Sequence, residues 1–158
     1  MIAVTFRPPT EADLDYLALN MREMDVRECW LVGGVGPREA LATGVRDSLW
    51  TYVAEIEGKP VSMFGVAPDG LLGDDGAPWM LSVEGVERHA RTTLLCAPRF
   101  VRAMSDSFER LANVVHADNR SAIRFLTWCG FAFGQPVKIG GEAFLPFEMT
   151  RQAERKAA

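Results

Sequence analysis

The sequence predicts an α/β domain built on one mixed sheet, and three observations support this fold class. Residues 50–56 place Trp, Tyr, Ala and Ile at alternate positions, which is the period-two pattern of a half-buried strand. Residues 10–21 and 88–111 instead repeat their apolar side chains at helical spacing. Along the chain these patterns give the order β-α-α-β-β-β-α-β-α-β-β, in which helices separate several of the strands.

The composition is that of an ordinary globular protein, and we expect one domain over residues 1–150 followed by a short tail over 151–158. The 158 residues are 48% hydrophobic and 24% charged, with a net charge of −4. Because the chain is acidic, we expect no nucleic-acid partner. No apolar run approaches the roughly 20 residues of a membrane helix, and the N-terminus lacks the basic and apolar regions of a signal peptide.

The cysteines and histidines exclude several site classes. Cys29, Cys96 and Cys129 lie far apart and form no CxxC pair, which argues against a disulfide framework or structural zinc and favours a reducing intracellular setting. His89 and His116 have no partners at ligand spacing, so we expect no metal. A thiol nucleophile at Cys96 or Cys129 is disfavoured because both lie in apolar helical stretches, where small buried cysteines are common.

The first half of the chain divides into recognisable elements. Residues 4–6 predict a short strand that ends before the Pro8-Pro9 pair. Thr10 and Asp13 have the spacing of a capping box in its acidic form, so a helix should begin there. The segment "LVGGVGPREAL" lacks the spacing of both glycine-rich phosphate motifs, and Pro37 makes it a turn that leads into a second short helix.

The remaining elements follow from the same rules. Residues 50–68 predict two strands around a turn at 57–60, and the polar segment 71–78 connects them to a strand over 79–83. A long helical stretch then reaches about residue 110 and precedes a strand over 112–117. The chain ends with a helix that begins at Asn119 and a hairpin around Gly140-Gly141.

The long helical stretch carries an unneutralised row of arginines. At 100° per residue, Arg91, Arg99 and Arg102 each lie within about 60° of Arg88. The opposite side gathers apolar residues: Ala97, Phe100, Val101, Met104, Phe108 and Leu111. No acidic residue lies between Glu87 and Asp106, so the row is either a solvated helix face or an anion-binding face.

The segment "NRSAIRFLTWCGF" (119–131) forms a helix with clear ends. Asn119 is a good N-cap, and Gly130 can take the left-handed position after the helix while Phe131 turns back onto it. Asn119, Ala122, Gly130 and Phe131 also stand where the last conserved segment of the GNAT (acyl-CoA N-acyltransferase) superfamily has the same residues. The segment "VAEIEGKPVSMFGV" resembles the second and third strands of that family.

The resemblance implies a fold and a chemistry. It implies a GNAT-like fold, with a mostly antiparallel mixed sheet of about seven strands, helices on both faces and splayed central strands. It also implies acetyl-CoA as the cofactor and a small-molecule or protein amine as the acceptor. Residues 78–133 further resemble the GNAT-like proteins of short-tailed phages, some of which are internal virion or head-morphogenesis proteins. That likeness implies phage origin, partners among virion proteins, and a location in the host cytoplasm or the virion.

The resemblance also implies where the cofactor binds. The strand edge Leu81, Ser82 and Val83 would hold the pantetheine, and Asn119 would lie near its polar end. The pyrophosphate would lie at Arg88, Arg91, Thr92 and Thr93. The family has glycines where this chain has Arg91 and Thr93, so side chains would have to replace backbone amides as anion donors.

The catalytic groups are less fully matched. The family often has a tyrosine general acid where this chain has Leu126, so that role is vacant or filled elsewhere. Glu84 and His116 are the candidate general bases, with Glu55 as a third. Each has an alternative as a surface carboxylate or a sheet histidine. Two hypotheses remain: a weak or degenerate acyl-CoA N-acyltransferase-like phage protein, or a non-catalytic virion scaffold. The sequence leaves the acceptor and the oligomeric state open.

Overall fold

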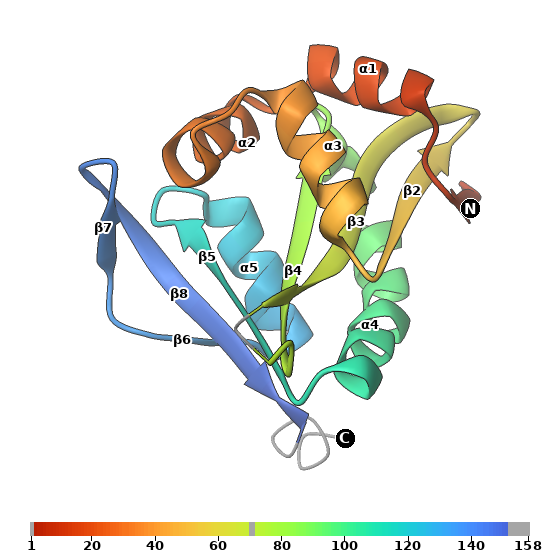
Figure 1. Cartoon of the computed structure of the whole chain (residues 1–158). Coiled ribbons are helices and arrows are strands. Elements are labelled where there is room, and N and C mark those ends of the chain that lie inside the picture. The colour runs from red at the N-terminus through yellow and green to blue at the C-terminus, as the bar shows by residue number, and fades with distance from the viewer. Residues whose placement is uncertain (1, 70–71, 152–158) are drawn as a thin grey trace. The chain divides into compact units, whose positions relative to one another are not determined.

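The computed structural model describes residues 2–69 and 72–151, and these form two compact units (Figure 1). The first unit comprises Met1–Ala67 and Trp79–Thr92, and the second comprises Pro68–Pro78 and Thr93–Ala158. Apart from residue 151, the predicted tail lies outside the described residues, and the domain boundary at residue 150 stays a prediction.

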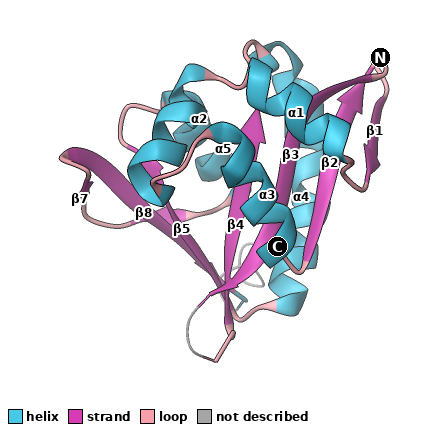
Figure 2. Ribbon diagram, turned by 45° about the horizontal axis from the view of Figure 1, so that its top comes forward, coloured by secondary structure: helices cyan, strands magenta, loops and turns pink. Residues whose placement is uncertain are grey.

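The first unit holds most of the N-terminal elements. Its order is β1 (Val4–Arg7), α1 (Glu11–Asn20), α2 (Glu23–Glu28), η1 (Cys29–Gly33), α3 (Pro37–Asp47), β2 (Trp50–Ile56) and most of β3 (Lys59–Asp69). The end of β4 (Asp75–Ser82) and the short 3-10 helix η2 (Val86–His89) complete it. Figures 1 and 2 show α1 and α3 side by side, with α3 next to β2.

Local rules explain most of these boundaries. The predicted capping box is confirmed, because Thr10 and Asp13 satisfy each other's backbone amides at the start of α1. Pro37 occupies the first turn of α3, as predicted. The hairpin β2–β3 turns at Glu57 and Gly58, both with positive φ, which matches the twist of the two strands. These elements enclose a core of buried residues: Leu14, Leu17, Met21, Cys29, Leu41, Val53 and Met63.

The second unit is organised around its last strand. It contains the start of β4, the body of α4 (Ala90–Ser107), β5 (Arg110–His116), α5 (Arg120–Cys129), β6 (Ala132–Phe133), β7 (Val137–Ile139) and β8 (Glu142–Thr150). β8 is antiparallel to β5 from Arg110↔Thr150 to His116↔Phe144, and it also pairs with β6 and β7. The Phe131 and Phe147 rings meet edge to face with centroids 5.2 Å apart.

The predicted fold class is confirmed as a mixed, mostly antiparallel α/β arrangement. Hydrogen-bonded neighbours follow the order β1-β2-β3-β4-β5-β8-β6, with β7 paired to β8. The pairs β1–β2, β2–β3, β5–β8, β6–β8 and β7–β8 are antiparallel. β4 and β5 are parallel, with Asp75 opposite Arg110 and Gly76 opposite Leu111.

The structure corrects three details of the predicted elements. The sheet has eight strands rather than about seven, since the segment before Gly140 is divided into β6 and β7 by Gly134, Gln135 and Pro136. Residues 23–33 form α2 and η1, which we did not predict. The long helix α4 starts at Ala90 and ends at Ser107, about three residues earlier than expected. In the described part of the chain, no helix combines the length and apolarity needed to cross a membrane.

Candidate functional site

The end of β4 is bound tightly to the turn between α1 and α2. The Arg22 amide donates to the Ser82 carbonyl at 2.9 Å, and the Glu84 amide donates to the Asn20 carbonyl at 2.9 Å. Met21 and Val83 form an isolated antiparallel bridge between the same two segments. The backbone at the end of β4 is therefore bonded to backbone that comes 60 to 64 positions earlier in the chain.

The backbone amides at the two edges of β4 donate hydrogen bonds to different kinds of acceptor. The Val83 amide donates to Val61 of β3 at 2.9 Å. Because successive residues of a strand direct their N–H groups to opposite edges, the Ser82 amide points away from β3. On that edge the Ser82 amide donates a hydrogen bond to Oδ2 of the Asp25 carboxylate at 2.9 Å. Asp25 of α2 is thus hydrogen-bonded to a backbone amide at the edge of β4, beside the predicted cofactor site.

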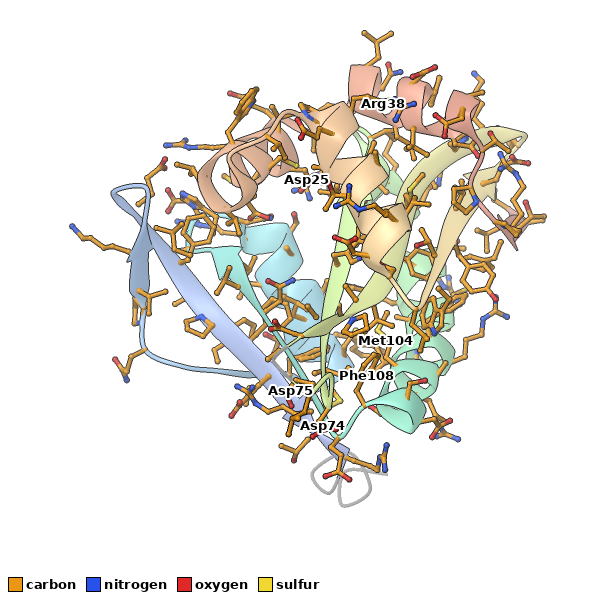
Figure 3. The ribbon with its side chains drawn as sticks, in the orientation of Figure 1. Asp25, Arg38, Asp74, Asp75, Met104 and Phe108 are labelled. Atoms are coloured by element: carbon orange, nitrogen blue, oxygen red, sulfur yellow. The ribbon has the colours of Figure 1, made fainter. Side chains whose placement is uncertain are left out.

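Asp25 is a buried carboxylate that forms an ion pair with Arg22. Asp25 lies on α2 (Figure 3) and is 3% exposed. Nη1 of Arg22 lies 3.2 Å from its Oδ1. Burial raises the pKa of Asp25 to about 7, and the nearby carboxylates Glu28 and Glu87 act in the same direction. Arg22 and the Ser82 amide oppose this increase without cancelling it.

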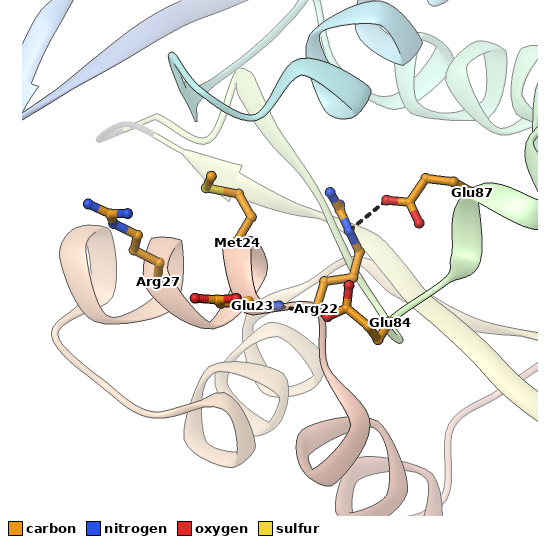
Figure 4. A pocket seen from close by; sticks show the side chains of 6 residues that line it. All are labelled: Arg22, Glu23, Met24, Arg27, Glu84 and Glu87. Atoms are coloured by element: carbon orange, nitrogen blue, oxygen red, sulfur yellow. Dashed lines mark hydrogen bonds and ion pairs between the residues drawn. The ribbon is translucent and has the colours of Figure 1, made fainter.

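A pocket of about 370 Å³ opens beside these residues (Figure 4). Glu84 lies on its wall and accepts from the Glu23 amide through Oε2 at 3.1 Å, which satisfies a free donor at the start of α2. Arg22 also reaches the pocket, where its Nε lies 3.1 Å from Oε1 of Glu87. The full lining is mixed in charge with three carboxylates: Arg22, Glu23, Met24, Arg27, Glu84 and Glu87.

The loop after Glu84 depends on one glycine. Gly85 has φ of +81°, and a Cβ at this position would lie 2.9 Å from Nη2 of Arg88. The Arg88 guanidinium therefore folds over a residue without a side chain, and its Nε donates to the Gly85 carbonyl at 3.2 Å. This glycine lies six residues before Arg91, the position at which the resembled family has a glycine.

The start of the long helix offers side chains rather than amides to an anion. The Arg88 amide donates to Gly85 and the Ala90 amide donates to Glu87, so these two donors are used within η2. Arg88 and Arg91 are exposed, and Thr92 and Thr93 are partly buried in the first turn of α4. The first turn contains no acidic residue. Guanidinium and hydroxyl groups at a helix N-terminus suit a phosphate group.

Two further predicted site residues, His116 and Asn119, lie in the second unit, and both form hydrogen bonds within it. His116 is buried on β5, with Nε2 2.9 Å from Oε1 of Glu142, while Nδ1 accepts from the Asp118 amide at 3.0 Å. This hydrogen-bond pattern places the ring proton on Nε2. Asn119 is buried and caps α5, accepting from the Ala122 amide as predicted.

The other candidate residues are engaged in the hydrogen bonding or packing of the fold. Glu55 accepts from Arg7, which also binds Asp13, so it belongs to the network that anchors the start of α1. Burial raises the pKa of the Cys129 thiol to about 11, which disfavours a thiolate nucleophile there. Leu126, in the place of the family's tyrosine, is partly buried on α5.

The structure places Glu84, the residue directly after the strand edge Leu81–Val83, on the wall of the pocket. It adds three residues that sequence reasoning missed: Asp25, Arg22 and Gly85. Only Gly85 left a sequence signal, because a glycine directly after a strand and before a helix indicates a special backbone conformation.

Comparison with known proteins supports the same fold. No protein-family model and no curated protein matches this sequence. Among solved structures, the aminoglycoside acetyltransferase AAC(6')-Ib in complex with coenzyme A is 19% identical, with a TM-score of 0.68 over 99% of this chain and 100% of that one. The ribosomal-protein-alanine N-acetyltransferase from Brucella melitensis is 19% identical, with a TM-score of 0.69 over 92% and 99%.

A third similar structure carries the family name. The GNAT-family acetyltransferase from Streptococcus pneumoniae is 14% identical, with a TM-score of 0.66 over 94% of this chain and 99% of that one. The chain therefore has the fold of the GNAT acetyltransferases over nearly its whole length.

Proposed function

We propose that the protein is an acyl-CoA-dependent N-acyltransferase that moves an acetyl group from acetyl-CoA to an amine. The observation that carries this proposal is the fold likeness, which spans 99% of this chain against an acetyltransferase that binds coenzyme A. The cluster at the end of β4 adds a carboxylate, a pocket and an arginine-bearing helix start within one compact unit.

The residues at the start of α4 fit the pyrophosphate of coenzyme A. Arg91 is exposed in the first turn, and Arg88 is held over Gly85 one turn earlier. Two guanidinium groups and the hydroxyls of Thr92 and Thr93 would hold the phosphates, in place of the amides that η2 uses internally. The pantetheine would lie along the edge Leu81–Val83, and Asn119 stays a cofactor contact that only the family resemblance implies.

Glu84 is the proposed general base. Its Oε2 is fixed by the Glu23 amide, and Oε1 has no hydrogen-bond partner among the residues that the structure describes. A carboxylate held in this way at the pocket wall can take a proton from an amine bound there. His116 is a weaker candidate for the same role, because both ring nitrogens already have partners, and we assign it to positioning the Glu142 end of β8.

The proposed reaction balances within this arrangement. Bound acetyl-CoA supplies a thioester, whose C–S bond breaks as the amine nitrogen forms a bond to the acyl carbon. Glu84 takes the proton that the amine loses. The departing thiolate is protonated by solvent, since Leu126 cannot donate a proton.

A binding experiment tests the cofactor assignment. Acetyl-CoA at 100 times its dissociation constant should stabilise the protein by about 2.7 kcal/mol, which raises the melting temperature by roughly 5–10 °C at this chain length. Arg91→Ala should remove most of this increase. Arg102→Ala is the matched control, because it removes an exposed arginine further along the same helix. Equal increases in the two variants would refute the pyrophosphate assignment.

A transfer experiment tests the chemistry. Release of the coenzyme A thiol would be measured with an aminoglycoside and with a peptide that has an N-terminal alanine, the acceptors that the similar enzymes suggest. Glu84→Gln keeps an oxygen for the Glu23 amide but cannot act as a base, so kcat should fall by about 100-fold or more. An unchanged kcat would remove Glu84 from the mechanism.

A non-catalytic role in a phage virion is the second candidate. It is favoured by the internal use of the Arg88, Ala90 and Ser82 amides, which leaves few backbone donors for a ligand. In that case the fold would serve as a scaffold that contacts other virion proteins. Absence of any stabilisation by millimolar acetyl-CoA would favour this scaffold over the enzyme.

A further inference from the structure

The pocket beside Glu84 has opposite charges at its two ends. Figure 4 shows Arg27 at one end and Glu84 with Glu87 at the other, with Met24 between them. Glu84 is held at the level of Glu23, because its Oε2 accepts from the Glu23 amide at 3.1 Å. Arg27 follows one helical turn later on α2, which is about 6 Å along the helix axis. A ligand that fills this pocket therefore meets carboxylates at one end and a guanidinium at the other.

The acidic end of the pocket suits an amine. The cation at this end, Arg22, bonds to Asp25 through Nη1 at 3.2 Å and to Glu87 through Nε at 3.1 Å. Two carboxylates therefore already balance its charge, and Glu84 adds a further negative charge beside them. An ammonium group is attracted to this end of the pocket, where Glu84 is the proposed base.

The exposed face of the helix that forms this wall continues from the pocket to Trp30. Glu23, Arg27 and Trp30 are exposed at the spacing i, i+4 and i+7, which places them on one face. Asp25 and Cys29, on the other side, are buried. Trp30 is 57% exposed and lies in η1, about 10 Å along the axis from Glu23.

The glycine-rich segment after Trp30 leaves room for its ring. A Cβ at Gly36 would lie 3.3 Å from Cζ2 of the indole, so the ring rests against a residue that has no side chain. Gly34, with φ of +66°, takes the left-handed position that ends η1. Within residues 2–69 and 72–151, the indole has no ring, cation or hydrogen-bond partner. The segment, which fits neither glycine-rich phosphate motif, thus presents an aromatic surface beyond the Arg27 end of the pocket.

We propose that the acceptor is a short peptide of dipeptide length, with a free N-terminal amine, a free carboxylate and an apolar side chain next to that carboxylate. This inference rests on the proposed function, because the amine at Glu84 is the group that receives the acetyl group. The carboxylate binds Arg27, whose guanidinium has several N–H donors and can hold it beside a partner within the chain. The apolar side chain packs on Trp30.

The length of the ligand follows from the spacing of the two charged ends. Two extended residues span about 7 Å, which is close to the rise of about 6 Å between Glu23 and Arg27. In a single amino acid the amine and the carboxylate share one carbon, so the two groups cannot reach both ends. A polycation such as an aminoglycoside offers nothing to Arg27.

The first experiment isolates the carboxylate. Alanyl-phenylalanine and its C-terminal amide have the same backbone and ring and differ in one negative charge. In wild type, kcat/KM for the dipeptide should exceed that for the amide by roughly 10- to 100-fold, the effect of a hydrogen bond between charged groups. Arg27→Met should abolish this preference, and Arg27→Lys should keep part of it because the positive charge remains. Arg46→Met, which removes an exposed arginine of α3, is the control and should keep the wild-type preference.

The second experiment isolates the aromatic surface. Alanyl-phenylalanine would be compared with alanyl-alanine, which has the same two charges and no ring. Trp30→Ala should reduce the preference for the aromatic dipeptide by roughly 3- to 10-fold, the effect of one aromatic pair. Trp128→Ala removes a tryptophan of α5 that is 62% exposed and should leave the preference unchanged. An equal preference in wild type and Trp30→Ala would refute the role of Trp30.

The outcomes separate this inference from the proposed function. If acetyl-CoA stabilises the protein but the dipeptide is not acetylated, or if Arg27→Met keeps the wild-type preference for the carboxylate, the inference is refuted while the proposed function stands. If acetyl-CoA does not stabilise the protein and no amine is acetylated, the proposed function fails and the inference fails with it. A carboxylate preference that is lost in Arg27→Met and kept in Arg46→Met supports both.

Discussion

Replacing Asp25 by asparagine should change how the stability of the protein depends on pH. The side chain is 3% exposed, and burial raises its pKa from an ordinary value of 3.8 to about 7. A raised pKa means that the folded state prefers the neutral acid. The stability that this group contributes is therefore complete below about pH 4 and is lost as the pH rises through about 7.

The size of this loss follows from the pKa. At about 1.4 kcal/mol for each pH unit, the interval from 3.8 to about 7 corresponds to about 4 kcal/mol. Asparagine is neutral at every pH and has no such loss. The free energy of unfolding of Asp25→Asn, taken relative to wild type, should therefore increase by about 4 kcal/mol between pH 4 and pH 8. Other titrating groups are common to both proteins and cancel in this difference.

Urea unfolding at a series of pH values, followed by tryptophan fluorescence, measures this difference. Asp13→Asn provides a control of opposite sign. The Arg7 guanidinium lowers the pKa of Asp13, so its contribution is present above the unfolded pKa of about 4 and is lost as the pH falls below it. The difference in free energy of unfolding between wild type and Asp13→Asn should shrink in acid. The difference between Asp25→Asn and wild type should grow as the pH rises. A constant Asp25→Asn difference from pH 4 to pH 8 would refute the buried-charge argument.

Three further substitutions test the packing of the two units by urea unfolding. In an exposed helix, replacing glycine by alanine stabilises a protein by about 1 kcal/mol. Gly44→Ala should instead destabilise this protein by about 1–3 kcal/mol, because the new Cβ would lie 2.6 Å from the Trp79 ring. A gain in stability would contradict this contact. Gly130→Ala should cost about 1 kcal/mol, since φ is +96° after α5, and an unchanged midpoint would speak against strain there. Phe144→Ala should cost about 3–5 kcal/mol, because the ring is fully buried 5.0 Å from the His116 ring; a loss below 1 kcal/mol would show that the site collapses around the cavity.

Features with short-range causes could be predicted from the sequence. Thr10 and Asp13 are three residues apart and cap α1 with their own side chains, so the sequence contains all the information needed. The same holds for Asn119 and Gly130 at the two ends of α5. The predicted burial of one side of α4 is also confirmed, with Met104 buried.

Features that depend on distant partners could not be predicted in this way. Asp25 lies in the polar stretch "REMDVRE", where nothing distinguishes it from an exposed aspartate. Its burial and its bond to Ser82 depend on a contact across 57 positions. The six-residue helix α2 was missed for the same reason, because its stability comes from the backbone bonds to β4 and from Glu84 rather than from its own apolar pattern.

The position of β8 has a consequence for synthesis of the protein. This strand pairs with β5 along the whole length of β5 and with β6 and β7 as well, yet the ribosome makes it after all three. Until Glu142 to Thr150 have emerged, β5 has a strand edge with unsatisfied amides and carbonyls beside the apolar Leu111 and Val115. Such an edge invites pairing with other nascent chains. Translation that stalls before Glu142 should therefore yield aggregates and degradation products instead of a partly folded fragment.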